Sequence, residues 1–496
     1  MTTIILRIGS KDVVECTQSP IQLFDLSEVS NGSTALVSIS DEQTQAVPLE
    51  SIETCSPWLV FTSNDISRVQ ISVSLTNQEG QVLARSALLH SDVADLHGTL
   101  SRPLFSSSLS IIGTVTFSYH LVTPYTPPTS TKFNYTSFST DHLHERTLRI
   151  GHRGSGNSSK ALDDFRAHFQ ENTLLSFQSA AEKCDWIELD VQLTADDVPI
   201  LLHDWFVIEQ NQSEKIDEDY TVKPVYDVKL RELWKMTDHV RVFKSPQPVR
   251  KSLDASPIPR VRSQKSFKTS DHFHDDAAKG QHSRRPLTSK NPKVINPLPL
   301  PSIRDVIPTL EKVLQALPSE TGLNIEVKYP DGKLWKELED LSYPERNHFC
   351  DIILDICFKY GKTRPIVFSS FDPDVCACLK FKQSIWPVFY LSTAGHEEHH
   401  DKRMMTIDDA IDWVSLIGLD GIVSECSVLV ENPELIEKVK AKGLVLWSYG
   451  GLNNSEEAIK KQLDYKIDGI ISDSIKNLVK VIPRELTEAV GNEVSN

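Results

Sequence analysis

The sequence predicts an α/β fold: a TIM (β/α)8 barrel with a long disordered insert, preceded by an all-β, sandwich-like domain. Three observations carry this prediction. Apolar runs alternate with amphipathic segments over residues 146–482, as in parallel α/β proteins. Short apolar runs of period two, separated by polar clusters, fill residues 1–122, as in β-sandwiches. A stretch rich in Ser, Pro, Lys and Arg, at about residues 240–298, interrupts the barrel pattern.

Composition limits the class of protein. The 496 residues are 39% hydrophobic and 24% charged, which is ordinary for a soluble chain of two or more domains. The net charge of −16 argues against general nucleic-acid binding. The chain has no run of about 18 apolar residues, so no transmembrane segment is expected, and its first residues do not resemble a secretory signal. We therefore expect a cytoplasmic protein whose eight cysteines are reduced.

The N-terminal domain, residues 1–122, contains strand-like runs such as TIILRI and TALVSIS. A C2-like sandwich is one interpretation, in which Asp12, Asp25 and Asp41 would bind calcium. Solvated loop acids explain these residues more simply, because no ligand spacing repeats. Residues 123–145 are rich in Pro, Ser and Thr, which predicts an extended linker to the barrel.

The barrel region, residues 146–482, is expected to contain eight strands and is followed by a C-terminal tail, 483–496. Strands are predicted at 148–150, 186–193, 322–329, 365–371, 386–392, 421–424, 444–449 and 469–472. Helices are predicted at 171–184, 303–317 and 346–360, with helical segments between most later strands. Residues 199–203 fit an outer hairpin extension. Asn172 is expected to serve the start of the first helix.

The insert at about residues 240–298 is basic, in contrast to the rest of the chain. Residues 241–293 hold 13 Lys or Arg and only four Asp or Glu. A compact barrel does not need so long a structureless loop, so we expect a disordered segment. The sequences RKSLDAS and RSQKSF place basic residues before Ser, as kinase sites do. Regulation by a kinase and an inert solvated loop remain equal alternatives.

Polar residues follow the first predicted strands. Residues 148–150 lead into Gly151-His152-Arg153-Gly154, and residues 199–202 lead into His203-Asp204. Imidazoles at such positions can act as acid and base. The planar Arg153 cation suits phosphate, and the two glycines let the backbone turn tightly beside a ligand.

Glu188 and Asp190 lie two residues apart in one predicted strand, so their side chains share a face. Two carboxylates on one face repel each other unless a cation lies between them. Oxygen ligands suit one divalent ion, Mg²⁺ or Ca²⁺. The sequence therefore predicts a metal site beside His152 and His203.

The ordered series HRG…EN…E-x-D…HD resembles the glycerophosphodiester phosphodiesterase family, a TIM-barrel family of metal-dependent enzymes. The segment Asn324-Ile325-Glu326-Val327-Lys328 is similar to a later strand of that family, and Trp447 and residues 468–473 also fit. The resemblance covers roughly residues 148–481 apart from the insert, and it is closest to the eukaryotic glycerophosphocholine phosphodiesterases.

The resemblance implies roles for nine residues. Its metal ligands are Glu188, Asp190 and Glu326, its acid–base pair is His152 and His203, and its phosphate- and substrate-binding residues are Arg153, Lys328, Glu171 and Trp447. Ordinary alternatives remain for the last three: a structural salt bridge for Lys328, helix capping for Glu171 and a core position for Trp447.

The resemblance also implies an activity, the metal-dependent hydrolysis of a small-molecule glycerophosphodiester. Glycerophosphocholine is the favoured substrate, with sn-glycerol 3-phosphate and choline as products. Two alternatives are kept: a lysophospholipase D-type enzyme on the same fold, which needs an apolar groove for an acyl chain, and an inactive barrel that serves as a regulatory scaffold.

Overall fold

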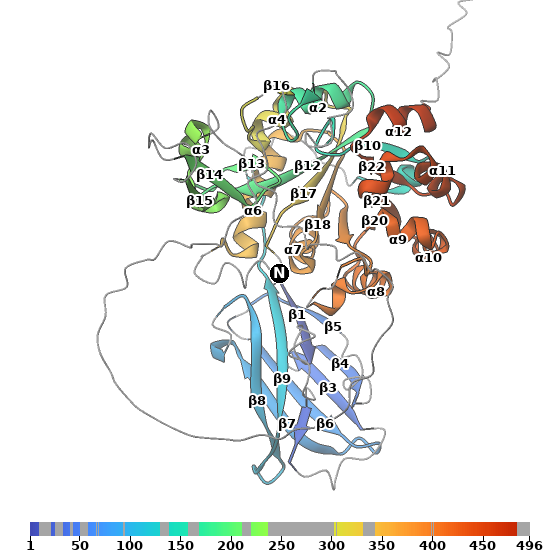
Figure 1. Cartoon of the computed structure of the whole chain (residues 1–496). Coiled ribbons are helices and arrows are strands. Elements are labelled where there is room, and N and C mark those ends of the chain that lie inside the picture. The colour runs from blue at the N-terminus through green and yellow to red at the C-terminus, as the bar shows by residue number, and fades with distance from the viewer. Residues whose placement is uncertain are drawn as a thin grey trace, which may run out of the picture.

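The computed structural model shows two domains, each built around a β-sheet, that contact each other (Figure 1). The structure describes residues 1–8, 21–24, 33–39, 43–49, 58–65, 67, 69–92, 95–128, 138–156, 168–210, 220–236, 302–303, 305–330, 343–397, 399 and 401–483. The predicted insert and C-terminal tail, and Asp12, Asp25 and Asp41, therefore lie outside the described residues, apart from Pro483.

The N-terminal domain is an antiparallel sheet with the order β4-β3-β6-β7-β8-β9-β1-β5, in which β2 also pairs with β9. Its strands are β1 (Thr2–Ile8), β2 (Ile21–Leu23), β3 (Thr34–Ile39), β4 (Gln43–Pro48), β5 (Trp58–Ser63), β6 (Gln70–Thr76), β7 (Val82–Leu89), β8 (His97–Ser106) and β9 (Ile111–Val122). Side-chain amides of Gln43 and Gln45 in β4 donate to the Thr62 and Val60 carbonyls of β5, each at 2.9 Å. The two end strands thus meet, and the sheet encloses its own apolar core.

The second domain is a closed barrel of parallel strands, which confirms the predicted fold class. Its order is β10-β22-β21-β20-β19-β18-β17-β12, and β10 also pairs with β12. The strands are β10 (Leu148–Gly151), β12 (Trp186–Leu193), β17 (Gly322–Val327), β18 (Ile366–Ser370), β19 (Val388–Ser392), β20 (Gly421–Glu425), β21 (Val445–Tyr449) and β22 (Gly469–Ser472). They are buried along most of their length, as expected for strands covered by helices on one face and packed inside the barrel on the other.

Helices surround the barrel (Figure 1). They are α2 (Leu174–Ala181), α3 (Leu230–Met236), α4 (Leu310–Ala316), α6 (Arg346–Tyr360), α7 (Pro373–Lys382), α8 (Ile407–Ile417), α9 (Cys426–Glu431), α10 (Glu434–Lys440), α11 (Glu456–Asp464) and α12 (Ile475–Val481). Short strands extend the top and side: β13 (Pro199–Leu201) is the expected antiparallel hairpin on β12, and β11 (His168–Phe169), β14 (Phe206–Gln210), β15 (Tyr220–Pro224) and β16 (Ser302–Ile303) form two further pairs.

Two helices begin later than predicted. The hydroxyl of Thr173 accepts from the Ser176 N–H and caps α2, while Asn172 has a φ of 56° and lies outside the helix. Likewise α4 starts after Thr309, whose hydroxyl accepts from the Lys312 N–H, because Pro308 lacks the N–H that a helix needs. Within the described residues, no helix is both long and apolar enough to cross a membrane.

The two domains meet through a buried arginine. Arg403 donates to Asp374 (2.7 Å) and Asp401 (2.6 Å), and its guanidinium lies 4.3 Å from the ring centroid of Trp58 in the N-terminal domain. Trp58 also packs edge-on against Trp413 of α8, with centroids 5.4 Å apart. Asn347 at the start of α6 adds a hydrogen bond from its amide to the Leu121 carbonyl, at 2.9 Å. The N-terminal domain is therefore fixed to the outer helices of the barrel.

We expect Trp58→Ala to lower the free energy of unfolding by about 2–4 kcal/mol, somewhat below the range for a fully buried aromatic. The loss has three sources: the contact with Trp413, the stacking of Arg403 and the more distant Arg7 guanidinium, 5.8 Å from the ring centroid. Urea unfolding followed by circular dichroism measures it, with Phe24→Ala as control because Phe24 is an exposed aromatic of the same domain. Equal effects of the two substitutions would contradict the described interface.

Candidate active site

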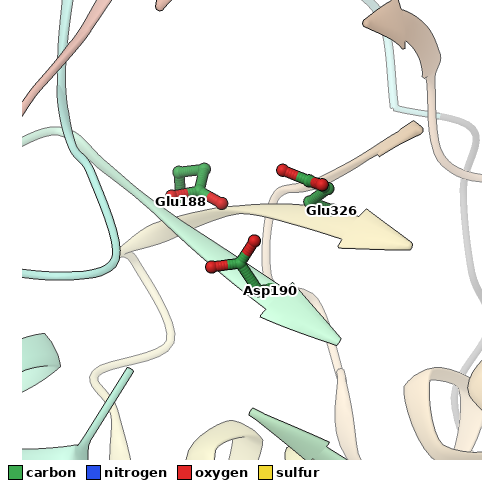
Figure 2. A group of neighbouring side chains, drawn as sticks. All are labelled: Glu188, Asp190 and Glu326. Carbon is green, nitrogen blue, oxygen red and sulfur yellow. The ribbon is translucent and has the colours of Figure 1, made fainter. Parts of the chain in front are cut away.

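Three carboxylates converge at the mouth of the barrel. Glu188 and Asp190 lie on β12 and Glu326 on the neighbouring β17, and Figure 2 shows their side chains turned toward one another. One ligand oxygen from each lies within 4.8 Å of the others. Asp190 and Glu326 are partners in the register of β12 and β17. The two strands run parallel, so their carboxyl ends lie at the same edge of the barrel. The three predicted metal ligands are thus brought together.

The donor set fits a hard divalent cation. Glu188 is 3% exposed and Asp190 1%, and Glu188 Oε1 and Asp190 Oδ1 lack hydrogen-bond partners in the described part of the chain. A buried carboxylate oxygen without a partner is costly. An ion bound by oxygen ligands would satisfy both atoms, as Mg²⁺ and Ca²⁺ do.

Arg153 and Asn172 fix the orientation of these acids. The Arg153 N–H donates to Glu188 Oε2 at 2.8 Å, and its guanidinium reaches Glu171 at 2.8 Å and Asp190 at 3.3 Å. The amide of Asn172 donates to Asp190 Oδ2 at 2.7 Å and its oxygen accepts from the Asp190 N–H at 3.2 Å. The expected role of Asn172 at the helix start is therefore wrong: Thr173 caps α2, and Asn172 holds a carboxylate.

His152 lies beside the carboxylates, at the end of β10. Its Nε2 is 3.8 Å from Glu188 Oε2, and its Nδ1 is 2.7 Å from Asp473 Oδ1. Asp473 follows β22, the strand next to β10, and its second oxygen accepts from the Asn454 amide at 3.2 Å. The sequence offered a signal for Asp473, an acid directly after an apolar strand, but none for Asn454.

His203 lies two residues after the end of β13. Its Nδ1 is 3.0 Å from Asp204 Oδ1. The amide of Gln192 donates to the carbonyls of Leu202 (2.6 Å) and Asp204 (2.9 Å), so β12 itself holds the segment that carries His203. Each predicted histidine thus has a carboxylate on its Nδ1, which leaves Nε2 for chemistry.

Lys328 brings a second cation to the site. Its ammonium lies 3.3 Å from Glu326 Oε1 and 3.6 Å from Asp190 Oδ1, and it stands 5.0 Å from the ring centroid of Trp205. The side chain is buried. A structural salt bridge was the alternative to phosphate binding for Lys328, and two such ion pairs are present. They place the Lys328 charge at the edge of the carboxylate cluster.

Burial and charge separate the acidities of these groups. Burial, with the charge of Asp190, raises the pKa of Glu188 to about 8, whereas the Arg153 and Lys328 cations outweigh burial and lower the pKa of Asp190. Burial opposes protonation of His152, but Asp473 and Glu188 raise its pKa overall. Burial and the Lys328 charge lower the pKa of His203. Burial raises the pKa of Asp204 to about 7.

Trp447 does not reach the mouth of the barrel. It is fully buried, lies edge-on to Trp186 (5.4 Å between centroids) and Phe389 (4.9 Å), and belongs to the apolar cluster inside the barrel. The predicted contact with substrate is therefore wrong for Trp447, and the core alternative fits, because no ring face is left for a ligand. Glu171, in contrast, lies at the site through its ion pair with Arg153.

A barrel with an acidic cluster and two histidines at the carboxyl ends of its strands fits a class, the TIM-barrel hydrolases, and the cluster could hold a metal ion. The chain belongs to the glycerophosphoryl diester phosphodiesterase family, whose family model matches residues 152–477. A second model, described as a GDE1-like C2 domain, matches residues 1–126.

Curated relatives agree with this assignment. The chain is 30% identical to a glycerophosphocholine phosphodiesterase, GDE1, of Candida albicans over 77% of this chain and 32% of that protein. It is 31% identical to a glycerophosphodiester phosphodiesterase, GDPD2, of Arabidopsis thaliana over 68% of this chain and 77% of that protein. It is 29% identical to the human glycerophosphocholine phosphodiesterase GPCPD1 over 79% of this chain and 53% of that protein. The chain thus spans about a third of the fungal relative and about half of the human one.

We expect Glu188→Gln to stabilise the metal-free protein at pH 8. The folded pKa of Glu188, about 8, exceeds its ordinary value of 4.5, so the folded state keeps a proton that the unfolded state loses. Wild-type stability therefore falls as pH rises from about 4.5 to 8, and Gln, which is always neutral, escapes this loss. Urea unfolding in chelator at pH 5, 6.5 and 8 should show a difference that grows to about 1–3 kcal/mol. A constant difference would contradict the shift.

We expect Asp473→Asn to lower the pKa of His152. Without the carboxylate, burial and the Arg153 charge are opposed mainly by Glu188. Nuclear magnetic resonance titration of ¹⁵N-labelled imidazoles in the metal-free protein measures the change, with His152→Gln to assign the signal. Glu456→Gln is the control, because Glu456 pairs with Lys480 on the outer helices. An unchanged His152 titration would show that Asp473 does not set its charge.

Proposed function

We propose that this chain catalyses metal-dependent hydrolysis of glycerophosphodiesters, with glycerophosphocholine as the substrate and sn-glycerol 3-phosphate and choline as products. One observation carries the proposal: two buried carboxylates and one partly buried carboxylate with ligand oxygens within 4.8 Å, flanked by two histidines and two cations. A metal ion, proton transfer and positive charge together suit phosphodiester cleavage.

Glu188, Asp190 and Glu326 would hold one divalent ion, Mg²⁺ or Ca²⁺. When bound, it supplies positive charge to a phosphoryl oxygen and lowers the pKa of bound water. The Arg153 and Lys328 side chains add charge at the same edge, where negative charge grows in the transition state. Both are held by carboxylates in the described structure, which keeps them in place before substrate arrives.

His152 and His203 would transfer the protons. The attacking oxygen must lose a proton and the leaving alkoxide must gain one, so one imidazole serves each step. Asp473 and Asp204 each hold an Nδ1 atom, which fixes the ring and directs Nε2 toward the reacting groups. The described geometry supports these roles equally for either assignment of acid and base.

Glycerophosphocholine is proposed because the fungal and human relatives bear the name glycerophosphocholine phosphodiesterase. The cytoplasm is the proposed location, since the six cysteines in the described residues are free thiols, as in a reducing compartment. Phosphorylation of the basic insert is a separate proposal that rests on its sequence alone.

We expect a chelator to abolish the release of glycerol 3-phosphate, and Mg²⁺ or Ca²⁺ to restore it. Asp190→Asn should reduce turnover to background, since a neutral amide is a poor ligand for a hard ion. A coupled assay for glycerol 3-phosphate measures activity, and Asp408→Asn, on the exposed face of α8, is the control. Full activity in excess chelator would overturn the mechanism. Faster cleavage of lysophosphatidylcholine would favour the lysophospholipase alternative.

We expect His152→Ala and His203→Ala each to lower kcat by about 10² or more, the usual scale for a positioned acid or base. The double variant should be much less than multiplicatively worse, because the two groups serve one reaction. His348→Ala is the control, since that imidazole is exposed and pairs with Asp197 outside the site. A single variant with near-wild-type kcat would remove that histidine from the mechanism.

A further inference from the structure

A second wall of the barrel mouth lies on strands away from the carboxylate cluster. Side chains alternate along a strand, so the residue two positions beyond an inward core residue also faces inward. Val367, Val423 and Trp447 belong to the interior cluster. Two residues further along β20 and β21 come Glu425 and Tyr449, and Phe371 directly follows the end of β18. These three residues therefore lie above the core of the barrel.

Contacts confirm that the three residues adjoin. Glu425 and Tyr449 are direct partners in the register of β20 and β21. The rings of Phe371 and Tyr449 lie edge-to-face, with centroids 5.7 Å apart, and both pack on the interior cluster. All three side chains are partly exposed. They form a half-open corner with two aromatic rings and one carboxylate, which we call the acidic aromatic wall.

The carboxylate of this wall is held in place. Glu425 Oε2 accepts hydrogen bonds from the N–H of Ser427, at 2.6 Å, and from its hydroxyl. Its Oε1 lies over Gly450, where a Cβ atom would stand only 2.5 Å away. Within the part of the chain that the structure describes, no Lys or Arg pairs with Glu425. The carboxylate is therefore fixed in position, and no cationic side chain of the described residues occupies it.

The wall adjoins the strand that carries Glu326. Glu326 of β17 pairs in register with Ser369 of β18, and Phe371, whose ring contacts Tyr449, follows two residues later. A diester whose phosphate lies beside Glu326 and its partners would extend its alcohol toward this wall.

The surroundings of Trp205 differ in charge from those of the acidic aromatic wall. Trp205 has the Lys328 ammonium 5.0 Å from its ring centroid, so a positive charge already occupies that face. A second cation would be repelled there, whereas the acidic aromatic wall attracts one. The mouth therefore has a cationic side, suited to phosphate, and an anionic side that can take only a neutral or positive group.

We propose that Glu425, Tyr449 and Phe371 form the subsite for the leaving alcohol and select a cationic headgroup of the quaternary ammonium class. Such a group has no N–H to donate, so ring faces and one fixed carboxylate satisfy it without further hydrogen bonds. This inference rests on the proposed phosphodiesterase function. Headgroup recognition is thus assigned to the partly exposed acidic aromatic wall and not to the buried Trp447.

The test compares glycerophosphocholine with glycerophosphoglycerol, whose leaving alcohol is uncharged. Glu425→Gln keeps the acceptor for Ser427 and removes only the charge, so it should raise KM for the choline diester roughly 3- to 30-fold more than KM for the glycerol diester. Tyr449→Leu should erode the preference similarly, and Tyr449→Phe should retain most of it because the ring remains. Glu431→Gln, at the far end of α9, is the matched control.

A second readout needs no substrate preference. Tetramethylammonium should inhibit hydrolysis of glycerophosphoglycerol competitively in the wild type, with an inhibition constant that rises at least 3-fold in Glu425→Gln. Variants that slow both diesters equally and leave tetramethylammonium inhibition unchanged would overturn the subsite while the phosphodiesterase function stands. A wild-type protein that cleaves neither diester in Mg²⁺ or Ca²⁺ would overturn the function itself.

Discussion

Glu188, Asp190 and Glu326 repel one another in a volume from which most water is excluded, and the groups around them balance that repulsion. Arg153 and Lys328 neutralise Asp190, and Asn172 donates to the oxygen that Arg153 approaches. Among the described residues, Glu188 receives the Arg153 N–H and has the more distant His152 beside it, so burial and the charge of Asp190 raise its pKa. The uneven balance leaves a demand for positive charge that a divalent ion would meet.

The same constraint explains the chain of contacts behind His152. A histidine that faces a carboxylate cluster needs a fixed ring, because a rotated ring would lose its position beside Glu188. Asp473 supplies this from the next strand, and Asn454 holds Asp473 in turn through its amide. The oxygen of Asn454 also accepts from the Asp473 and Ser474 N–H groups, so the turn after β22 is shaped around this one side chain. Support of this kind determines how closely a site keeps its geometry.

Much of the fold and the carboxylate cluster was predictable from sequence, because both follow local patterns. Strand β12 matches its predicted bounds, and period two along that strand is enough to place Glu188 and Asp190 on one face. The burial of individual side chains inside the barrel could not be predicted, because it depends on how far along the barrel axis each residue lies. Trp447 and Tyr449 share one face of β21, and only the packing of the interior shows that the first is buried and the second reaches the mouth. Asn172 was predicted to cap the helix because an Asn directly before a helix often does so, but it binds Asp190 instead.

The contact between Arg403 and Trp58 bears on how the mouth of the barrel is held. Arg403 ends the loop after β19, which carries His396 beside Ser427, the residue that fixes Glu425. Its guanidinium ties that loop to α7 through Asp374 and to the N-terminal domain through Trp58. The N-terminal domain therefore helps to hold the loop after β19 in position. A chain cut to its barrel alone would keep Glu188, Asp190 and Glu326 on their strands but would lose the Trp58 contact that helps to hold this loop.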